Sequence, residues 1–123
     1  MDDEGEIADG QLERREADER EAAELTELIR EKALQLTRDE VPHSISVEID
    51  ELEDKLLRAF VLVETESQKQ ILVGKKGAMI REIGTRARPE VEKLLGHKVF
   101  LELVVKVRPK WRRDEAQLER LGL

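Results

Sequence analysis

The sequence predicts one α+β domain in which helices cover one face of a three-stranded sheet. Apolar residues alternate with polar ones in three segments, as in half-buried strands, and recur with helical spacing in others. The length of 123 residues fits one compact domain with a short appendage. We expect the domain over residues 23–123 and, over residues 1–22, an acidic extension that is disordered or partly helical.

The N-terminal segment, up to Pro42, predicts a helix that packs on the domain only along its C-terminal part. Residues 1–10 hold two glycines and five acids without an apolar period, so we expect them to be disordered. Strong helix formers follow from Gln11. The packed helix should start near Ala23 and stop before Pro42, because residues before proline disfavour helix. Its apolar stripe is Leu25, Leu28, Ile29 and Leu36.

Three strands follow from period-two alternation. Residues 44–50 and 56–66 are joined by a short charged turn, which predicts an antiparallel hairpin. Residues 98–107 form the third strand, which Pro109 ends, and residues 112–121 form a short amphipathic helix. Trp111 anchors that helix in our interpretation. The apolar face of the second strand is Leu57, Ala59, Val61 and Val63, and that of the third is Val99, Leu101, Leu103, Val105 and Val107.

Two further helices flank a glycine loop between the second and third strands. Ser67 is the expected N-cap of a helix that begins near Gln68. A longer helix follows Gly77 and ends at Gly96, a residue type suited to helix C-termini. Pro89 lies inside the longer helix, so we expect a kink or a break there.

The loop Gly74-Lys75-Lys76-Gly77 is the sharpest local pattern in the chain. Glycines permit a tight turn and the close approach of another backbone. The start of the following helix offers unpaired N–H groups and the positive end of a dipole, which together favour phosphate groups. Lys75 and Lys76 add two positive charges. This pattern predicts an anion site, although an isolated GxxG can also mark only a helix break.

Charge distribution supports an anionic partner despite the total of −7. Residues 1–24 carry 11 acidic and 3 basic side chains, and residues 25–66 carry 11 and 5. Residues 67–123 reverse the balance, with 7 acidic and 14 basic side chains. The basic half contains the glycine loop. The acidic segment is most simply a solubilising linker, and competition with an anionic ligand for the basic face is the alternative.

Composition argues against several other functions. The chain has no cysteine and two histidines, so neither a disulfide scaffold nor a thiolate or histidine-rich metal site is expected. The glycine loop lacks the spacing of a nucleotide-binding P-loop. No nucleophile–base pair is recognisable, so we take His43 as structural and His97 as solvated. We expect no catalytic residue, no cofactor, no metal, no membrane span and no secretory signal, and we expect a cytoplasmic monomer.

Several separated motifs in this order resemble the type II KH domain at the C-terminal end of the Era family of bacterial ribosome-assembly GTPases. The element order α-β-β-α-α-β is similar to that of type II KH domains, which clamp about four nucleotides at a GxxG loop. The resemblance covers roughly residues 25–123. Its motifs are R-D-E-V-P-H-S at 38–44, S-Q-K at 67–69, V-G-K-K-G-A-M-I at 73–80, I-G-T-R-A-R at 83–88, K-V-F-L-E-L at 98–103, V-K-V at 105–107, W-R-R-D at 111–114 and L-G at 121–122.

The resemblance implies binding of single-stranded RNA near the 3′ end of small-subunit ribosomal RNA, within the ribosomal small subunit. This sequence departs from the family because a charged segment stands where the GTPase domain would be, and because Gln70 replaces a frequent glycine. An absent N-terminal GTPase domain is therefore a further expected partner. The expected RNA-binding residues are Gly74, Lys75, Lys76, Gly77, Lys69, Ile71, Met79, Ile80 and Arg81.

Some alternatives stay open at this point. Ile71 and Ile80 are equally compatible with core packing. For Arg86 and Arg88 we expect a solvated helix face rather than a contact with RNA. With three aromatic residues in the chain, base stacking should not dominate recognition. The second candidate function is a protein-interaction module that docks to a GTPase or a ribosomal protein and leaves the RNA cleft unused.

Overall fold

The structure is a computed structural model, and it describes residues 3–37 and 45–109. Within these ranges it confirms the α+β class and the expected order of elements. The predicted helix at 112–121, Trp111 and His43 lie outside the described residues. The elements are α1 (Asp3–Thr37), β1 (Ser46–Glu53), β2 (Leu56–Val63), α2 (Glu66–Val73), the short 3₁₀ helix η1 (Lys75–Gly77), α3 (Ala78–Leu95) and β3 (Phe100–Val107).

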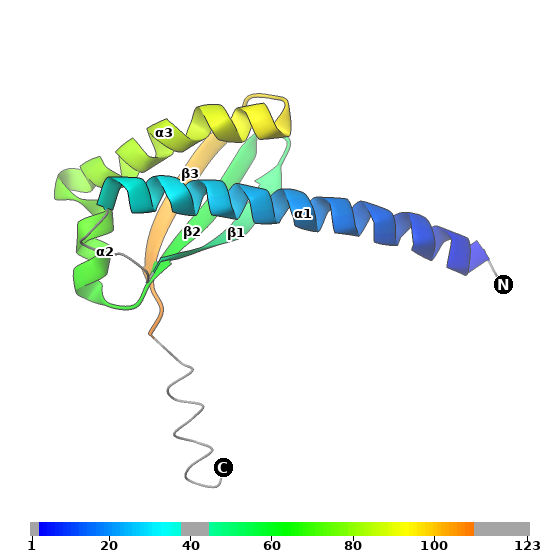
Figure 1. Cartoon of the computed structure of the whole chain (residues 1–123), viewed down its shortest axis with the longest axis horizontal. Coiled ribbons are helices and arrows are strands. Elements are labelled where there is room, and N and C mark those ends of the chain that lie inside the picture. Colours follow the sequence, from blue (N-terminus) through cyan, green and yellow to red (C-terminus); the bar gives the residue numbers. More distant parts are fainter. Residues whose placement is uncertain (1–2, 38–44, 110–123) are drawn as a thin grey trace, which may run out of the picture.

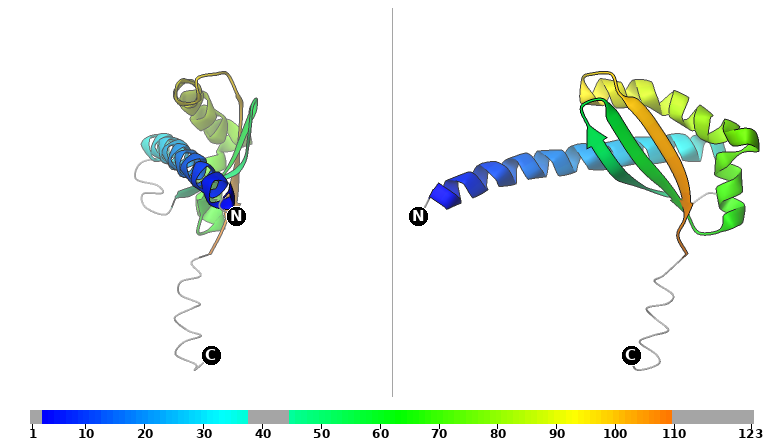
Figure 2. Two further views of the ribbon diagram at one scale, coloured as in Figure 1. Left: turned by 90° about the vertical axis from the view of Figure 1, so that its right-hand side faces the viewer. Right: turned by 180° about the vertical axis from the view of Figure 1, so that it is seen from behind.

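The three strands form one sheet in the order β1-β2-β3, with the helices on one face (Figures 1 and 2). β1 and β2 pair antiparallel, as the short turn between them predicted, with an irregularity between Ile49 and Glu51. β2 and β3 pair parallel. Because β2 is the central strand, β1 and β3 are the two edges, and β3 is the edge that lies beside α3 in Figure 1.

The core lies between the helices and the inner face of the sheet. The alternating face of β2 is buried as predicted, with Leu57, Ala59 and Val61 fully inaccessible and Val63 at 1% exposure. The helices contribute residues spaced four apart, which lie on one side of each helix. These are Leu25, Ile29 and Ala33 from α1 and Ile83, Ala87 and Val91 from α3, all fully buried.

α1 is longer than expected, and the prediction of disorder over residues 1–10 is wrong where the structure describes them. One helix runs from Asp3 to Thr37 and projects past the edge of the sheet (Figure 1). The packed part begins at Leu25, close to the predicted start.

α2 begins two residues earlier than predicted. Its N-cap is Thr65 rather than Ser67. The Gln68 backbone N–H donates to Thr65 Oγ1 at 3.1 Å, and the Thr65 backbone N–H donates to Gln68 Oε1 at 3.2 Å. This reciprocal pair is a capping box, which satisfies two N–H groups that helix geometry otherwise leaves unpaired.

α3 continues through Pro89 to Leu95, so the predicted break is absent. Ala87 and Val91 flank the proline and are both fully buried, and their packing holds the helix on both sides of Pro89. The predicted end at Gly96 is confirmed, with a φ of +83° and an N–H that donates to the Glu92 carbonyl. No helix among the described residues is both long enough and apolar enough to cross a membrane.

Candidate nucleic-acid interface

The loop between α2 and α3 is a tight turn that depends on glycine. Gly74 has φ +73° and ψ 176°, a region that essentially only glycine occupies. Gly77 is left-handed, with φ +77° and ψ 14°, and its N–H donates to the Gly74 carbonyl at 3.1 Å. Lys76 is also left-handed, at φ +56°. The turn therefore joins the end of α2 directly to the start of α3.

Gly74 also allows a close approach between two helices. A Cβ atom on Gly74 would lie 2.7 Å from both the Cβ and the backbone N of Met79. A side chain at this position would therefore push the first turn of α3 away. At Gly77 the nearest atom to a Cβ would be Nη1 of Arg81, at 3.4 Å, which places this guanidinium beside the loop.

Lys75 and Lys76 are exposed at the tip of the turn. No acidic side chain in residues 16–37 and 45–109 forms an ion pair with either lysine. The start of α3 beside them has no side-chain cap. Two lysines and the positive end of a helix dipole therefore gather at one exposed point, which is a favourable place for phosphate.

Other cationic side chains, unlike the two loop lysines, form ion pairs with acidic residues of the protein. On the outer face of the sheet, Arg58 contacts Glu102 at 3.0 Å and Glu51 at 3.1 Å, and these partners raise its pKa. The Arg108 guanidinium forms two hydrogen bonds to Glu48, at 2.7 and 3.0 Å, and lowers the pKa of that carboxyl. These arginines are largely neutralised by their partners, unlike the loop lysines.

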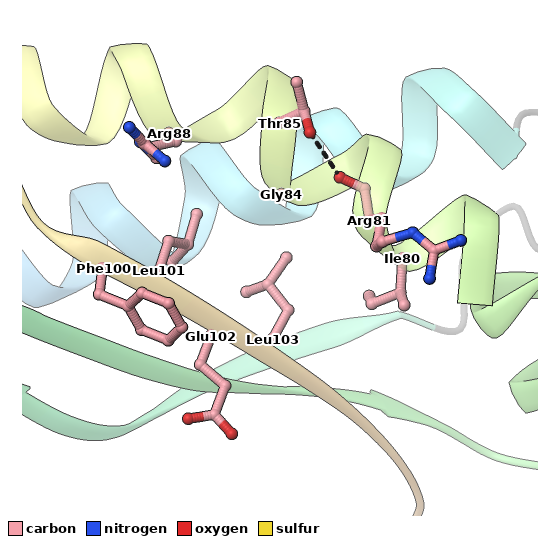
Figure 3. Close-up of a pocket in the computed structure, with 9 residues that line it drawn as sticks. All are labelled: Ile80, Arg81, Gly84, Thr85, Arg88, Phe100, Leu101, Glu102 and Leu103. Atoms are coloured by element: carbon pink, nitrogen blue, oxygen red, sulfur yellow. Dashed lines mark hydrogen bonds between the residues drawn. The ribbon is translucent and has the colours of Figure 1, made fainter.

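A groove begins at Ile80 and Arg81, in the first turn of α3 after the loop, and follows α3 and the edge strand β3 (Figure 3). It encloses about 330 Å³. Arg81 and Ile80 lie at its loop end, and Arg88 and Phe100 lie at its far end. Because Leu101 and Leu103 alternate with Glu102 along β3, the strand gives the groove an apolar side. The lining residues are Ile80, Arg81, Gly84, Thr85, Arg88, Phe100, Leu101, Glu102 and Leu103.

The structure brings together most of the predicted site residues. The four loop residues, Ile80 and Arg81 lie at the loop or along the groove. Ile71 and Met79 are partly buried against the core and do not line the groove. Ile80 packs against the core and also lines the groove. Lys69 is partly buried on α2, away from the groove lining.

Sequence reasoning missed the β3 side of the groove and the far end of the α3 side. Thr85 and Arg88 follow Arg81 at helical spacing, and that periodicity is the signal that could have placed them on one face. Arg88 was instead interpreted as part of a solvated face. Its side chain is 58% exposed and 3.4 Å from Glu92, and it also lines the groove. Arg86, paired with Glu82 at 2.8 Å, lies on the solvated face as expected.

Comparisons with known proteins identify the family. A family model described as a KH domain matches residues 40–112. The chain is 54% identical over 101 residues to GTPase Era of Leuconostoc citreum, covering 78% of this chain and 33% of that protein. It is 50% identical over 121 residues to GTPase Era of Mycobacterium sp. (strain KMS), covering 93% of this chain and 39% of that protein.

Solved structures give the same result. A crystal structure of an Aquifex aeolicus Era variant bound to GDP and AlF4− superposes with a TM-score of 0.70 at 43% identity, covering 80% of this chain and 35% of that one. A second, of Era in complex with MgGDPNP and nucleotides 1506–1542 of 16S ribosomal RNA, gives a TM-score of 0.68 at 44% identity and covers 77% and 34%.

The chain spans only 33% to 39% of the length of these curated relatives, and the matching part is their C-terminal portion. The KH-domain model nevertheless covers more than half of this chain, and the two relatives are at least 50% identical to it over most of its length. The chain therefore belongs to the KH-domain family and is similar to the C-terminal KH domain of GTPase Era.

Proposed function

We propose that this chain binds single-stranded RNA, with the RNA backbone held at the loop Gly74–Gly77 and the bases in the groove between α3 and β3. The observation that carries the proposal is the glycine turn at the start of α3, whose two lysines form no ion pair with the described side chains. Phosphate groups favour such a point, and GxxG loops of KH domains clamp about four nucleotides. Ile80, Leu101 and Leu103 offer apolar contacts to the bases.

The proposed RNA is small-subunit ribosomal RNA near its 3′ end, and the proposed setting is assembly of the small subunit. The support comes from the similar Era structure, which holds nucleotides 1506–1542 of 16S ribosomal RNA. In this proposal the chain acts in the cytoplasm as a monomer that binds RNA without turnover. A GTPase domain remains a proposed partner, because the curated relatives carry a longer chain than the part matched.

Reversal of the loop charge tests the proposed cleft. The double change Lys75→Asp and Lys76→Asp should abolish binding to an RNA of nucleotides 1506–1542, because it replaces two phosphate contacts by repulsion. Fluorescence anisotropy at several salt concentrations measures the affinity. The parent chain should bind more weakly as salt rises, since counterions are released from the RNA.

The matched control is Lys93→Asp with Lys98→Asp, which changes the charge equally at two exposed positions away from the loop. The control should keep most of the affinity at 0.15 M salt. Circular dichroism checks that both variants fold. Equal binding by the loop variant and the parent would overturn the proposed cleft.

Backbone amide shifts separate RNA binding from protein docking. Titration with the same RNA should move the amide resonances of residues 74–77 if the loop clamps the strand. Amides that stay unmoved while RNA is in excess would favour the protein-interaction alternative. A GTP turnover assay on the chain should give no activity above buffer.

A further inference from the structure

Phe100 has the most exposed large apolar side chain among the described residues, at 67%. It is the first residue of β3 and lines the groove at the end away from the glycine loop (Figure 3). From Gly77 to Arg88, which marks the same end of the groove, the helix advances 11 residues, or roughly 16 Å at the rise of an α-helix. The ring therefore lies well beyond the loop that holds the RNA backbone.

The backbone that carries this ring is held by its pairing with β2. The Phe100 N–H donates to the Lys55 carbonyl at 2.8 Å, and the residue is paired in register with Leu56 of β2. An exposed ring on a fixed strand loses little conformational freedom when a ligand covers it. Rigid aromatic side chains make effective contact surfaces for this reason.

The surroundings of the ring suit a nucleotide. Arg88 lines the same end of the groove, and its guanidinium, 58% exposed, lies 3.4 Å from the partly buried carboxylate of Glu92. Because this ion pair is long and its guanidinium is largely exposed to solvent, a phosphate can compete with Glu92 for Arg88. Glu102, the one acidic residue that lines the groove, is bound to Arg58 on the outer face at 3.0 Å, and this reduces its repulsion of RNA.

The other described aromatic ring is already covered. Lys106 Nζ lies 3.8 Å from the centroid of the Phe60 ring. Within residues 3–37 and 45–109, Phe100 is thus the aromatic ring open to a ligand in the groove.

We propose that Phe100 stacks on a nucleobase that lies beyond the nucleotides clamped at the glycine loop, and that Arg88 contacts the phosphate of that nucleotide. This inference rests on the proposed RNA binding and extends it by one subsite. Base–aromatic stacking tolerates any sequence because every base has a π-face. The subsite therefore adds affinity for longer strands without adding base preference.

RNAs of two lengths test the subsite in the full chain. We would measure the affinity for a four-nucleotide and a ten-nucleotide RNA taken from within nucleotides 1506–1542 of 16S ribosomal RNA. Phe100→Leu keeps an apolar side chain and removes the ring. It should weaken binding of the ten-nucleotide RNA about tenfold, the loss of one base–aromatic stack, and leave the four-nucleotide RNA unchanged. Phe100→Trp keeps an aromatic ring and should bind the ten-nucleotide RNA with the parent affinity.

Leu52→Ala is the matched control, because Leu52 is the other exposed large apolar residue, at 38%, and lies on the opposite edge strand. It should change neither affinity. A 2-aminopurine scan of the ten-nucleotide RNA should find a position whose fluorescence is quenched by the parent and by Phe100→Trp but not by Phe100→Leu.

The outcomes separate the two proposals. If the parent chain binds neither RNA, the proposed function fails. If the parent binds both and Phe100→Leu binds the longer RNA equally well, RNA binding stands and the stacking subsite is wrong. An equal loss for both lengths would also overturn the subsite, because it would place Phe100 within the four-nucleotide clamp.

Discussion

Gly74 is the loop residue at which a side chain is least tolerable, for two separate reasons. Its φ and ψ of +73° and 176° exclude side chains, and a Cβ would also lie 2.7 Å from Met79. Gly77 and Gly96 share the positive φ, but their surroundings are more open. The nearest neighbour of a Cβ on Gly77 is the flexible end of Arg81, and nothing lies within 4 Å of a Cβ on Gly96.

Alanine at each of these three glycines should therefore lower stability by different amounts. Gly96→Ala and Gly77→Ala should each cost about 1–2 kcal/mol, the cost of a left-handed residue with a Cβ. Gly74→Ala should cost more, because its backbone strain of about 1–3 kcal/mol is joined by displacement of α3. Urea unfolding at constant m-value measures the series. An equal loss for Gly74→Ala and Gly96→Ala would contradict the close approach at Met79.

At the scale of single elements, α2 offers a direct comparison between two residues of capping type. Thr65→Ala should lower the free energy of unfolding by about 1 kcal/mol, because it removes the acceptor for the Gln68 N–H. Ser67→Ala is the control and should change the free energy by a few tenths of a kcal/mol at most. Paired urea titrations of the two variants give the difference, and a larger loss for Ser67→Ala would place the cap where the sequence had suggested it.

The burial pattern of β2 and the end of α3 could be predicted from the sequence, whereas the N-cap of α2 and the continuity of α3 could not, for physical reasons. The alternation of β2 and the C-terminal glycine of α3 are local signals, and both are confirmed. The pattern Thr65-x-x-Gln68 is also a local signal, but Ser67 is an equally good capping type and competes with it. Continuity of α3 at Pro89 depends on the burial of Ala87 and Val91, which no local pattern reveals.

The groove could not be predicted from local patterns, because its two sides come from different elements, α3 and β3. The glycine loop could be recognised because its residues are contiguous. Phe100 and Leu103 reach the same groove as Arg88 only because β3 pairs parallel to β2 at the sheet edge beside α3. Strand pairing of this kind joins segments that are distant in sequence, and no local pattern determines its register or which side chains reach the groove.

For the whole molecule, the acidic segment and the basic loop are at opposite ends of the helical layer. Figure 1 shows the N-terminal part of α1 pointing away from the α2–α3 junction. From Glu24 to Leu36 the helix advances 12 residues, or roughly 18 Å. This length of helix lies between the acidic segment and the end of α1 beside α2. It exceeds the screening length of about 8 Å at 0.15 M salt and is shorter than the screening length of about 30 Å at 0.01 M salt.

Removal of residues 1–22, which carry ten acidic and three basic side chains, should therefore act through salt-dependent charge alone. RNA affinity should change less than about twofold at 0.15 M salt and rise severalfold at about 0.01 M, where screening is weak. Anisotropy titrations of the full and shortened chains at both salt concentrations test this, with circular dichroism to check folding. A large gain at 0.15 M would instead support direct competition between the acidic segment and RNA.

The length of α1 also has a mechanical meaning. The free part from Asp3 to Glu24 is a rod of roughly 33 Å, and it joins without interruption the segment that packs on the core through Leu25, Ile29 and Ala33. The Lys32–Glu90 ion pair ties this segment to α3, the helix that begins at the glycine loop. α1 is therefore a long rigid helix that is held at its C-terminal part, in contact with α3, and projects from there. A tilt of α1 by about one degree about its packed segment moves the far end by about 0.6 Å, so the position of that end is a sensitive measure of how α1 packs on α3.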